Sequence, residues 1–239
     1  ERVYLGIDGT LVNARAQNRF MEAKVGIVFS HQLALVETNR RLSQQLFTTA
    51  RGMGIDNQEQ LVILSDGARW INKLAQTQYP KATVILDWWH LKRRVWPTVR
   101  GLPADELSDQ ERQAWGQQWI DQLWRGQSRQ ALQSIMILAP QLGGQPSEKP
   151  AQLEERSLLA LHQFISNKRA AIIDYHHFQQ SGYYIGSALV EKTVDLLVCR
   201  RQKLRGQNWS RTGADRLLCW RQLILNDQWD DYWQQPEAA

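Results

Sequence analysis

Three acidic residues that lie far apart in the chain have the types and settings that metal-dependent phosphodiester chemistry uses. Asp8 and Asp66 each follow an apolar run that predicts a strand, and residues at the carboxyl ends of strands in an open α/β sheet face the site crevice. Glu191 lies in a late helical segment and is the candidate for a third carboxylate. Carboxylate oxygens hold hard divalent cations, and two such ions ~4 Å apart can activate an attacking oxygen and stabilise a leaving one. Together these residues indicate nuclease or strand-transfer chemistry.

Each acid also has an ordinary structural interpretation, because Asp-Gly after a strand is a common turn and a single helical Glu usually lies on the surface. The opening segment Gly6 to Leu11 is close to two further motifs, and neither is complete. A dehalogenase-type phosphatase needs a nucleophilic Asp at the position of Gly6, so that route lacks its attacking atom. The phosphate turn of actin-like sugar kinases is one residue longer, and a short glycine motif is weak evidence.

The elements that must position these acids are predicted from hydrophobic patterning. Apolar runs alternate with helical patterns, which indicates an α/β fold with buried strands in a mixed or parallel sheet covered by helices. Three of the strand-like runs are expected to end in an Asp, namely Asp8, Asp66 and Asp87. The expected strands are Arg2 to Ile7, Ala23 to Phe29, Leu33 to Glu37, Leu61 to Leu64 and Thr83 to Leu86. The expected helices in this part of the fold are Arg41 to Met53, one through Trp70, Leu74 and Tyr79, and Ser187 to Arg201 with Ser187 as its N-cap.

The middle of the chain, from Val95 to Gln180, has helical patterns and no convincing strand, so it is expected to be an all-helical insertion. Gly143 to Pro150 is expected to interrupt it as a loop. Trp115 and Trp119 lie four apart, which is mainly core spacing. The predicted organisation is a first core part at residues 1–94, the insertion at 95–180, and the last core helices with a basic segment at 181–239.

Charge is concentrated near the end of the chain. The 239 residues carry a net charge of +5, yet the stretch from Lys192 to Arg221 holds eight basic and two acidic residues, which leaves the remainder at −1. Trp209 and Trp220 are interleaved with these basic residues. Basic side chains neutralise phosphates and Trp stacks on unpaired bases, so this stretch indicates a nucleic-acid surface. A solvated helix face over two core tryptophans is the alternative.

Cellular location is constrained by what the sequence lacks. Cys199 and Cys219 are the two cysteines, too few for a disulfide scaffold, and no apolar run approaches the ~20 residues that span a bilayer. We therefore expect a soluble, cytoplasmic protein. The chain opens at Glu1 in an apolar strand pattern, so we expect a fragment that lacks an amino-terminal module.

Several whole segments, in order along nearly the full chain, resemble bacterial insertion-sequence transposases of the Kra group, relatives of the Mutator-like superfamily. Their joint match is more specific than any single motif. The segments are Ile7 to Val12 (IDGTLV), Glu22 to Phe29 (EAKVGIVF), Leu64 to Ile71 (LSDGARWI), Ile85 to Leu91 (ILDWWHL), Leu123 to Gln127 (LWRGQ), Tyr183 to Glu191 (YYIGSALVE), Arg200 to Ser210 (RRQKLRGQNWS) and Gly213 to Arg221 (GADRLLCWR).

This resemblance implies a ribonuclease H-like fold with an Asp-Asp-Glu triad that binds two Mg2+ or Mn2+ ions. By motif, the triad is Asp8, Asp66 and Glu191, with Asp8 bridging the ions and Glu191 completing the second site. His90, in the Asp87-Trp88-Trp89-His90 motif, is expected to orient a phosphate or protonate a leaving oxygen, or else to pin the strand end. Asp87 is expected to support the site without ligating metal.

The resemblance further implies an enzyme that cleaves transposon ends and joins them to target DNA, working as a homo-oligomer on double-stranded DNA in the bacterial nucleoid. Residues expected to contact DNA are Arg200, Arg201, Lys203, Arg205, Trp209 and Arg211. Two departures affect fine geometry and DNA affinity: Ala188 stands where a Gly is usual, and Gly206 to Ser210 lacks an Arg. The alternative is a domesticated or truncated transposase that binds DNA without cutting.

Overall fold

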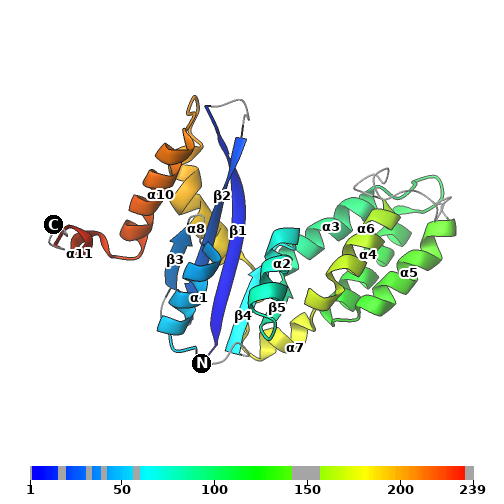
Figure 1. Ribbon diagram of the computed structural model, residues 1–239. Helices are drawn as coiled ribbons and strands as arrows, with labels where there is room; N and C mark the ends of the chain where they lie inside the picture. The colour runs from blue at the N-terminus through cyan, green and yellow to red at the C-terminus, as the bar shows by residue number, and fades with distance from the viewer. Residues whose placement is uncertain are drawn as a thin grey trace. The chain divides into compact units, whose positions relative to one another are not determined.

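The computed structural model describes residues 2–15, 20–30, 34–38, 42–55, 60–141 and 157–234. The chain divides into two compact units. The first comprises Glu1–Thr83 and Ser187–Ala239, and the second comprises Val84–Gly186. Figure 1 labels the elements of both units along the chain. Among the described residues, no helix combines the length and the apolar character needed to cross a membrane.

The first unit is built on a mixed sheet with flanking helices, which confirms the α/β expectation. Four of its strands lie in the order β3-β2-β1-β4, with β2 antiparallel to both β1 and β3, and with β4 parallel to β1. The strands are β1 (Val3–Asn13), β2 (Phe20–Phe29), β3 (Ala34–Thr38) and β4 (Leu61–Ser65), and β5 (Thr83–Leu86) leads from this unit into the second. The helices are α1 (Leu42–Gly52), α2 (Arg69–Gln78), α8 (Ala188–Val194), α9 (Arg200–Gln202), α10 (Arg211–Leu225) and α11 (Trp229–Gln234).

Helices cover both faces of this sheet, as two glycines show. A Cβ built on Gly26 would lie 2.7 Å from Leu46 Cδ2 of α1, and a Cβ built on Gly6 would lie 2.1 Å from Val190 Cγ2 of α8. Gly26 pairs with Ile7, and side chains alternate between faces along a strand, so Gly6 and Gly26 face opposite sides. The sheet is therefore buried between α1 and α8, which explains the continuous apolar strands.

The expected helix from Ser187 to Arg201 forms with one irregularity. A π-helical turn, Asp195–Cys199, lies between α8 and α9. Ser187 occupies the N-cap position of α8 but accepts no backbone N–H there; its Oγ instead donates to Glu191 Oε1 at 3.4 Å. The prediction of Ser187 as the N-cap is therefore confirmed in position, but its side chain does not make the usual capping hydrogen bond.

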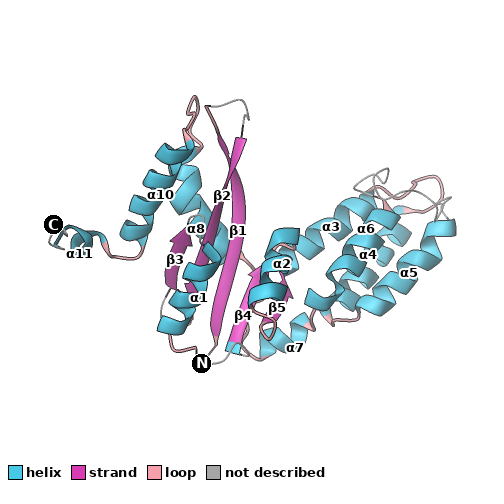
Figure 2. Ribbon diagram, in the orientation of Figure 1, coloured by secondary structure: helices cyan, strands magenta, loops and turns pink. Residues whose placement is uncertain are grey.

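From Trp88 onward, the described residues of the second unit form helices joined by turns and loops, with one isolated bridge between Arg125 and Asp174 and no strand (Figure 2). Its helices are α3 (Trp88–Arg100), α4 (Asp109–Trp124), α5 (Ser128–Gln141), α6 (Leu158–Lys168), the 3-10 turn Arg169–Ala171 and α7 (Tyr175–Gln180). Trp119 is fully buried and its indole N–H donates to Ser134 Oγ at 3.0 Å, so its core spacing is confirmed. The expected loop Gly143 to Pro150 lies outside the described residues.

The boundaries between the two units lie at other positions in the sequence than the predicted ones. The predicted breaks after residues 94 and 180 both fall inside the second unit. Residue 94 lies within α3, a continuous helix that packs against α4 and α6, so it cannot be a boundary. Helical periodicity in the sequence locates the helices, but it does not show that the residues from Val84 onward belong to the same compact unit.

Candidate functional site

The register of β1 and β4 brings the first two acids to neighbouring positions. Gly6 pairs with Leu64 in the parallel ladder, so Asp8 and Asp66 each lie two residues beyond that pair. Asp8 is half-buried and its Oδ1 accepts the N–H of Gly9 at 2.7 Å. The sequence prediction that these two acids share one edge of the sheet is therefore supported by strand pairing, although the prediction for Asp8 was wrong in one respect.

Asp8 does not end its strand. β1 continues to Asn13, because β2 pairs with it along the whole stretch from Asp8–Val25 to Asn13–Phe20. The Asp-Gly pair predicted a turn, but the hairpin partner holds these residues extended. The strand that ends near Asp8 is the neighbouring strand β4, whose last residue is Ser65. Asp8 therefore lies on β1 beside the carboxyl end of β4.

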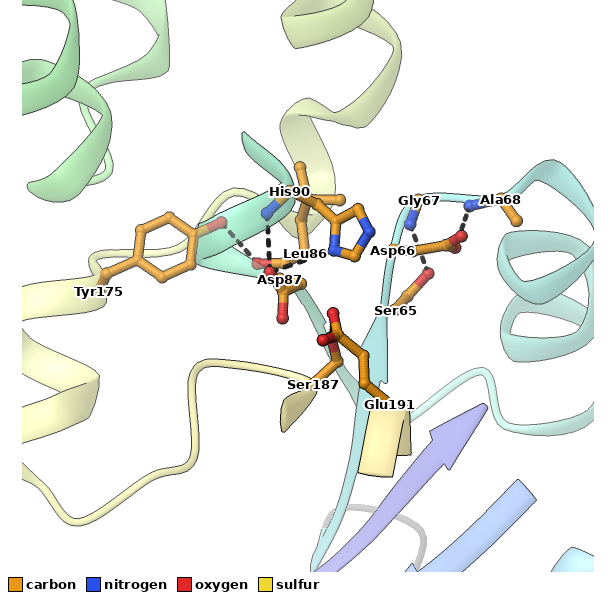
Figure 3. Close-up of polar contacts among 10 residues, drawn as sticks. All are labelled: Ser65, Asp66, Gly67, Ala68, Leu86, Asp87, His90, Tyr175, Ser187 and Glu191. Carbon is orange, nitrogen blue, oxygen red and sulfur yellow. Dashed lines mark hydrogen bonds and ion pairs between the residues drawn. The ribbon is translucent and has the colours of Figure 1, made fainter. Parts of the chain in front are cut away.

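Asp66 lies in a tight turn between β4 and α2. Its Oδ1 accepts the N–H of Ala68 at 2.7 Å, and Ser65 Oγ accepts the N–H of Gly67 at 2.9 Å (Figure 3). Gly67 has φ 89°, a left-handed conformation that favours glycine. The sequence Ser-Asp-Gly thus folds into a side-chain-bonded turn that fixes the Asp66 carboxylate.

Glu191 is carried on α8, which packs on the face of the sheet toward which Asp8 points. Val190 is buried over Gly6, and Gly6 and Asp8 share a face because they are two residues apart in β1. Glu191 itself is exposed and its Oε1 accepts the Ser187 hydroxyl. Sequence reasoning missed Gly6, although a glycine inside an apolar strand signals close approach of another element.

The three carboxylates do not close around a single point. No group of three or more His, Cys, Asp or Glu side chains among the described residues is gathered as metal ligands. In Figure 3 the Asp66 carboxylate is turned toward Ala68 rather than toward Glu191. Neighbouring carboxylates repel one another, and a divalent cation between them offsets that repulsion. As a donor set, three carboxylates have the chemistry that suits a hard cation such as Mg2+.

The Asp87 to His90 motif belongs to the second unit. Asp87 is 1% exposed and is the N-cap of α3, since its Oδ1 accepts the backbone N–H of His90 at 2.7 Å. His90 Nδ1 lies 3.3 Å from the same oxygen. This geometry gives Asp87 a structural role as the N-cap of α3 and places its carboxylate beside the His90 ring.

Tyr175, the first residue of α7, stabilises the carboxyl end of β5. Its hydroxyl donates to the Leu86 carbonyl oxygen at 2.8 Å (Figure 3). Its ring centroid lies 5.0 Å from that of Trp88. Burial raises the pKa of the Tyr175 phenol well above its usual value, and the negative charge of Asp87 raises it further. The phenol therefore remains a donor, and the end of β5 is firmly held.

The basic segment joins the sheet at the far end of β1. Trp209 forms a bridge with Ala14, its backbone N–H donates to Asn13 O at 2.9 Å, and its indole N–H donates to Gln202 O at 3.2 Å. Lys203 Nζ hydrogen bonds to Thr10 Oγ1, and Thr10 shares a face with Asp8. This contact brings a cation to the sheet face that carries Asp8, and nothing in the sequence indicated it.

The other predicted DNA-contacting residues are exposed. Arg200, Arg201, Arg205 and Arg211 all lie on the surface, whereas Trp209 is half-buried. Arg200 Nε donates to Asp195 Oδ2 at 2.7 Å, so part of its charge is neutralised locally. Trp209 has a structural role in tying the segment to β1.

Comparison of the chain with models of known protein families and with curated proteins finds no match to either.

Proposed function

We propose that this chain is the catalytic core of a metal-dependent DNA transposase, with a ribonuclease H-like sheet that carries an Asp-Asp-Glu triad. One observation carries the proposal: Asp8 on β1 and Asp66, just past the end of the neighbouring parallel strand β4, both lie two residues beyond the Gly6–Leu64 pair, and α8, which carries Glu191, packs on the face of the sheet that Asp8 shares. A mixed sheet with helices on both faces is the scaffold that this assignment requires. The resemblance to Kra-group insertion-sequence transposases names the same three residues.

In this proposal Asp8, Asp66 and Glu191 hold two divalent cations, Mg2+ or Mn2+. When bound, the ions lower the pKa of an attacking water and stabilise the charge on the scissile phosphate. Asp66 is pre-oriented by its bond from Ala68, while Glu191 is exposed and adjusts its side chain to complete the ligand set. The substrate is double-stranded DNA at the ends of a mobile element, and the released 3′-hydroxyl attacks target DNA, so no covalent enzyme intermediate forms.

The basic segment supplies contacts to the DNA backbone. Arg201, Lys203 and Arg205 are exposed, and Lys203 is anchored at Thr10 on the face that carries Asp8. Cations at this place hold a phosphate backbone across the carboxylates and do not read sequence. The proposal gives His90, whose Nδ1 lies 3.3 Å from Asp87 Oδ1, the role of contacting a phosphate or a leaving oxygen. The protein would act as a homo-oligomer in the bacterial nucleoid.

A second candidate is a transposase-derived protein that binds DNA without cutting. It is favoured by the absence, among the described residues, of three ligands gathered as a metal site. The basic segment would serve either function.

Nicking of a DNA that carries the element's end, measured with and without Mg2+, separates the two. The proposal predicts Mg2+-dependent nicking that Asp66→Asn abolishes, while the matched control Asp195→Asn, one helical turn after Glu191, retains it. Equal nicking by the wild-type protein and Asp66→Asn would remove the triad. DNA binding without nicking by the wild-type protein would establish the second candidate.

A further inference from the structure

A patch of exposed aromatic side chains lies on α10 and α11, away from the proposed catalytic residues. We call it the tryptophan patch. Its exposed fractions are 50% for Trp220, 47% for Ile224, 48% for Tyr232 and 58% for Trp233. Trp229, which is half-buried, completes it. Single exposed apolar residues are ordinary, but a contiguous group of this size marks an interaction surface.

The rings of the tryptophan patch contact one another and so form one surface. The Trp220 ring lies 5.8 Å from that of Trp229 and 6.3 Å from that of Trp233, measured between centroids. Trp229 and Trp233 are four residues apart, so both project from the same side of α11 onto α10. Even with these contacts, Trp220 and Trp233 keep half or more of their surface open to solvent.

Opposite charges flank the patch. Arg216 is exposed one helical turn before Trp220. Asp230 is exposed three residues before Trp233, a spacing that makes the two neighbours on the surface of α11. Within the part of the chain that the structure describes, neither residue makes an ion pair. Asp227, Asp230 and Asp231 gather negative charge here, which opposes the binding of a nucleic acid.

A surface with an aromatic centre, a cation at one end and an anion at the other is complementary to itself. When two copies are related by a two-fold axis, a contact between one residue of the first copy and a different residue of the second is repeated with the two copies exchanged. The axis would place Arg216 of one copy opposite Asp230 of the second, twice in each interface. Trp and Tyr at the centre of a patch are the residues that dominate binding energy at protein interfaces.

We propose that the tryptophan patch is a two-fold interface through which two copies of this chain associate, with Arg216 and Asp230 pairing across it. This inference names a surface for the self-association that the proposed function expects, and its test is separate from the test of the triad because α10 and α11 carry none of the three acids. It assigns a role to Trp220 and Trp233 that neither core packing nor phosphate binding explains.

Sedimentation equilibrium across a concentration series tests the interface. The wild-type protein should form a dimer, and Trp233→Ala should raise the dissociation constant of that dimer by about 30-fold or more. Arg216→Asp and Asp230→Arg should each weaken the dimer, because either change places two like charges opposite each other across the interface. The double variant Arg216→Asp/Asp230→Arg should recover the dimer, because the pairs are restored with exchanged sign.

Asp231→Arg is the matched control, since Asp231 lies on the side of α11 that faces away from the aromatic rings, and it should leave dimerisation unchanged. Far-UV circular dichroism verifies that each variant folds. A wild-type protein that stays monomeric at all concentrations would overturn the proposal, as would a double variant weaker than either single one. Loss of single-stranded oligonucleotide binding in Trp233→Ala, with unchanged mass, would instead make the patch a base-stacking surface.

Discussion

Replacing Gly6 by alanine tests whether α8 lies on the face of the sheet that Asp8 shares. The new Cβ would be 2.1 Å from Val190 Cγ2 and 3.0 Å from Ile27 Cγ2. Carbon atoms pack best at about 3.5–4.0 Å, so the Val190 contact is roughly 1.5 Å too short. Both neighbours are buried and β-branched, with little freedom to turn aside. Overpacking of this kind costs about 1–3 kcal/mol of unfolding free energy.

A compensating change identifies the cause. Val190→Ala alone removes two buried methyl groups and should cost about 1.5–2 kcal/mol. Once those methyls are gone, the Cβ added at position 6 has space, so Gly6→Ala/Val190→Ala should be nearly as stable as Val190→Ala. The coupling between the two changes should be at least ~1 kcal/mol.

Urea unfolding followed by far-UV circular dichroism measures these free energies for the wild type and the three variants. Additive effects, equal to the sum of the single changes within about 0.5 kcal/mol, would show that Val190 does not cover Gly6. Glu191 would then have no fixed relation to Asp8, and the reasoning would fail.

Three further expectations concern the stability of the rest of the fold. Ser134→Ala should destabilise by about 1–3 kcal/mol in a urea titration, because it leaves the buried indole N–H of Trp119 without its acceptor; no change would contradict that bond. Burial raises the pKa of Tyr79 from 10.0 to about 12, so stability should fall as pH rises from 10 to 12, by up to about 1.4 kcal/mol per unit, and Tyr79→Phe should remove that slope. Gly126→Ala should lower the melting temperature, because φ is 69° and a Cβ would lie 2.8 Å from the Asp174 nitrogen; an unchanged temperature would refute this packing.

The sequence was sufficient for elements that local patterning specifies. The runs Leu61 to Leu64 and Thr83 to Leu86 form strands at nearly their expected bounds, since buried strands need continuous apolar side chains. The end of β1 could not be predicted, because it depends on pairing with β2 across a hairpin and not on the Asp8-Gly9 pair itself.

The residues of the candidate site are a prediction from the sequence, and the contacts among their elements come from the structure alone. A strand followed by Ser-Asp-Gly marked Asp66, yet only the parallel register places Asp8 beside it. The basic segment was visible as charge, whereas its attachment through Trp209 to Asn13 joins residues far apart in the sequence and leaves no local signal. The side of the sheet on which α8 packs is a tertiary property that Gly6 alone hinted at.

The central claim is that Asp8, Asp66 and Glu191 share one face of the sheet and together hold divalent cations. An anomalous difference map from crystals of the protein soaked in Mn2+ tests it most directly. Manganese peaks should be bounded by oxygens of all three carboxylates, and the peaks should be lost in Asp8→Asn crystals. Manganese bound elsewhere, or Glu191 on the face of the sheet that α1 covers, would contradict it.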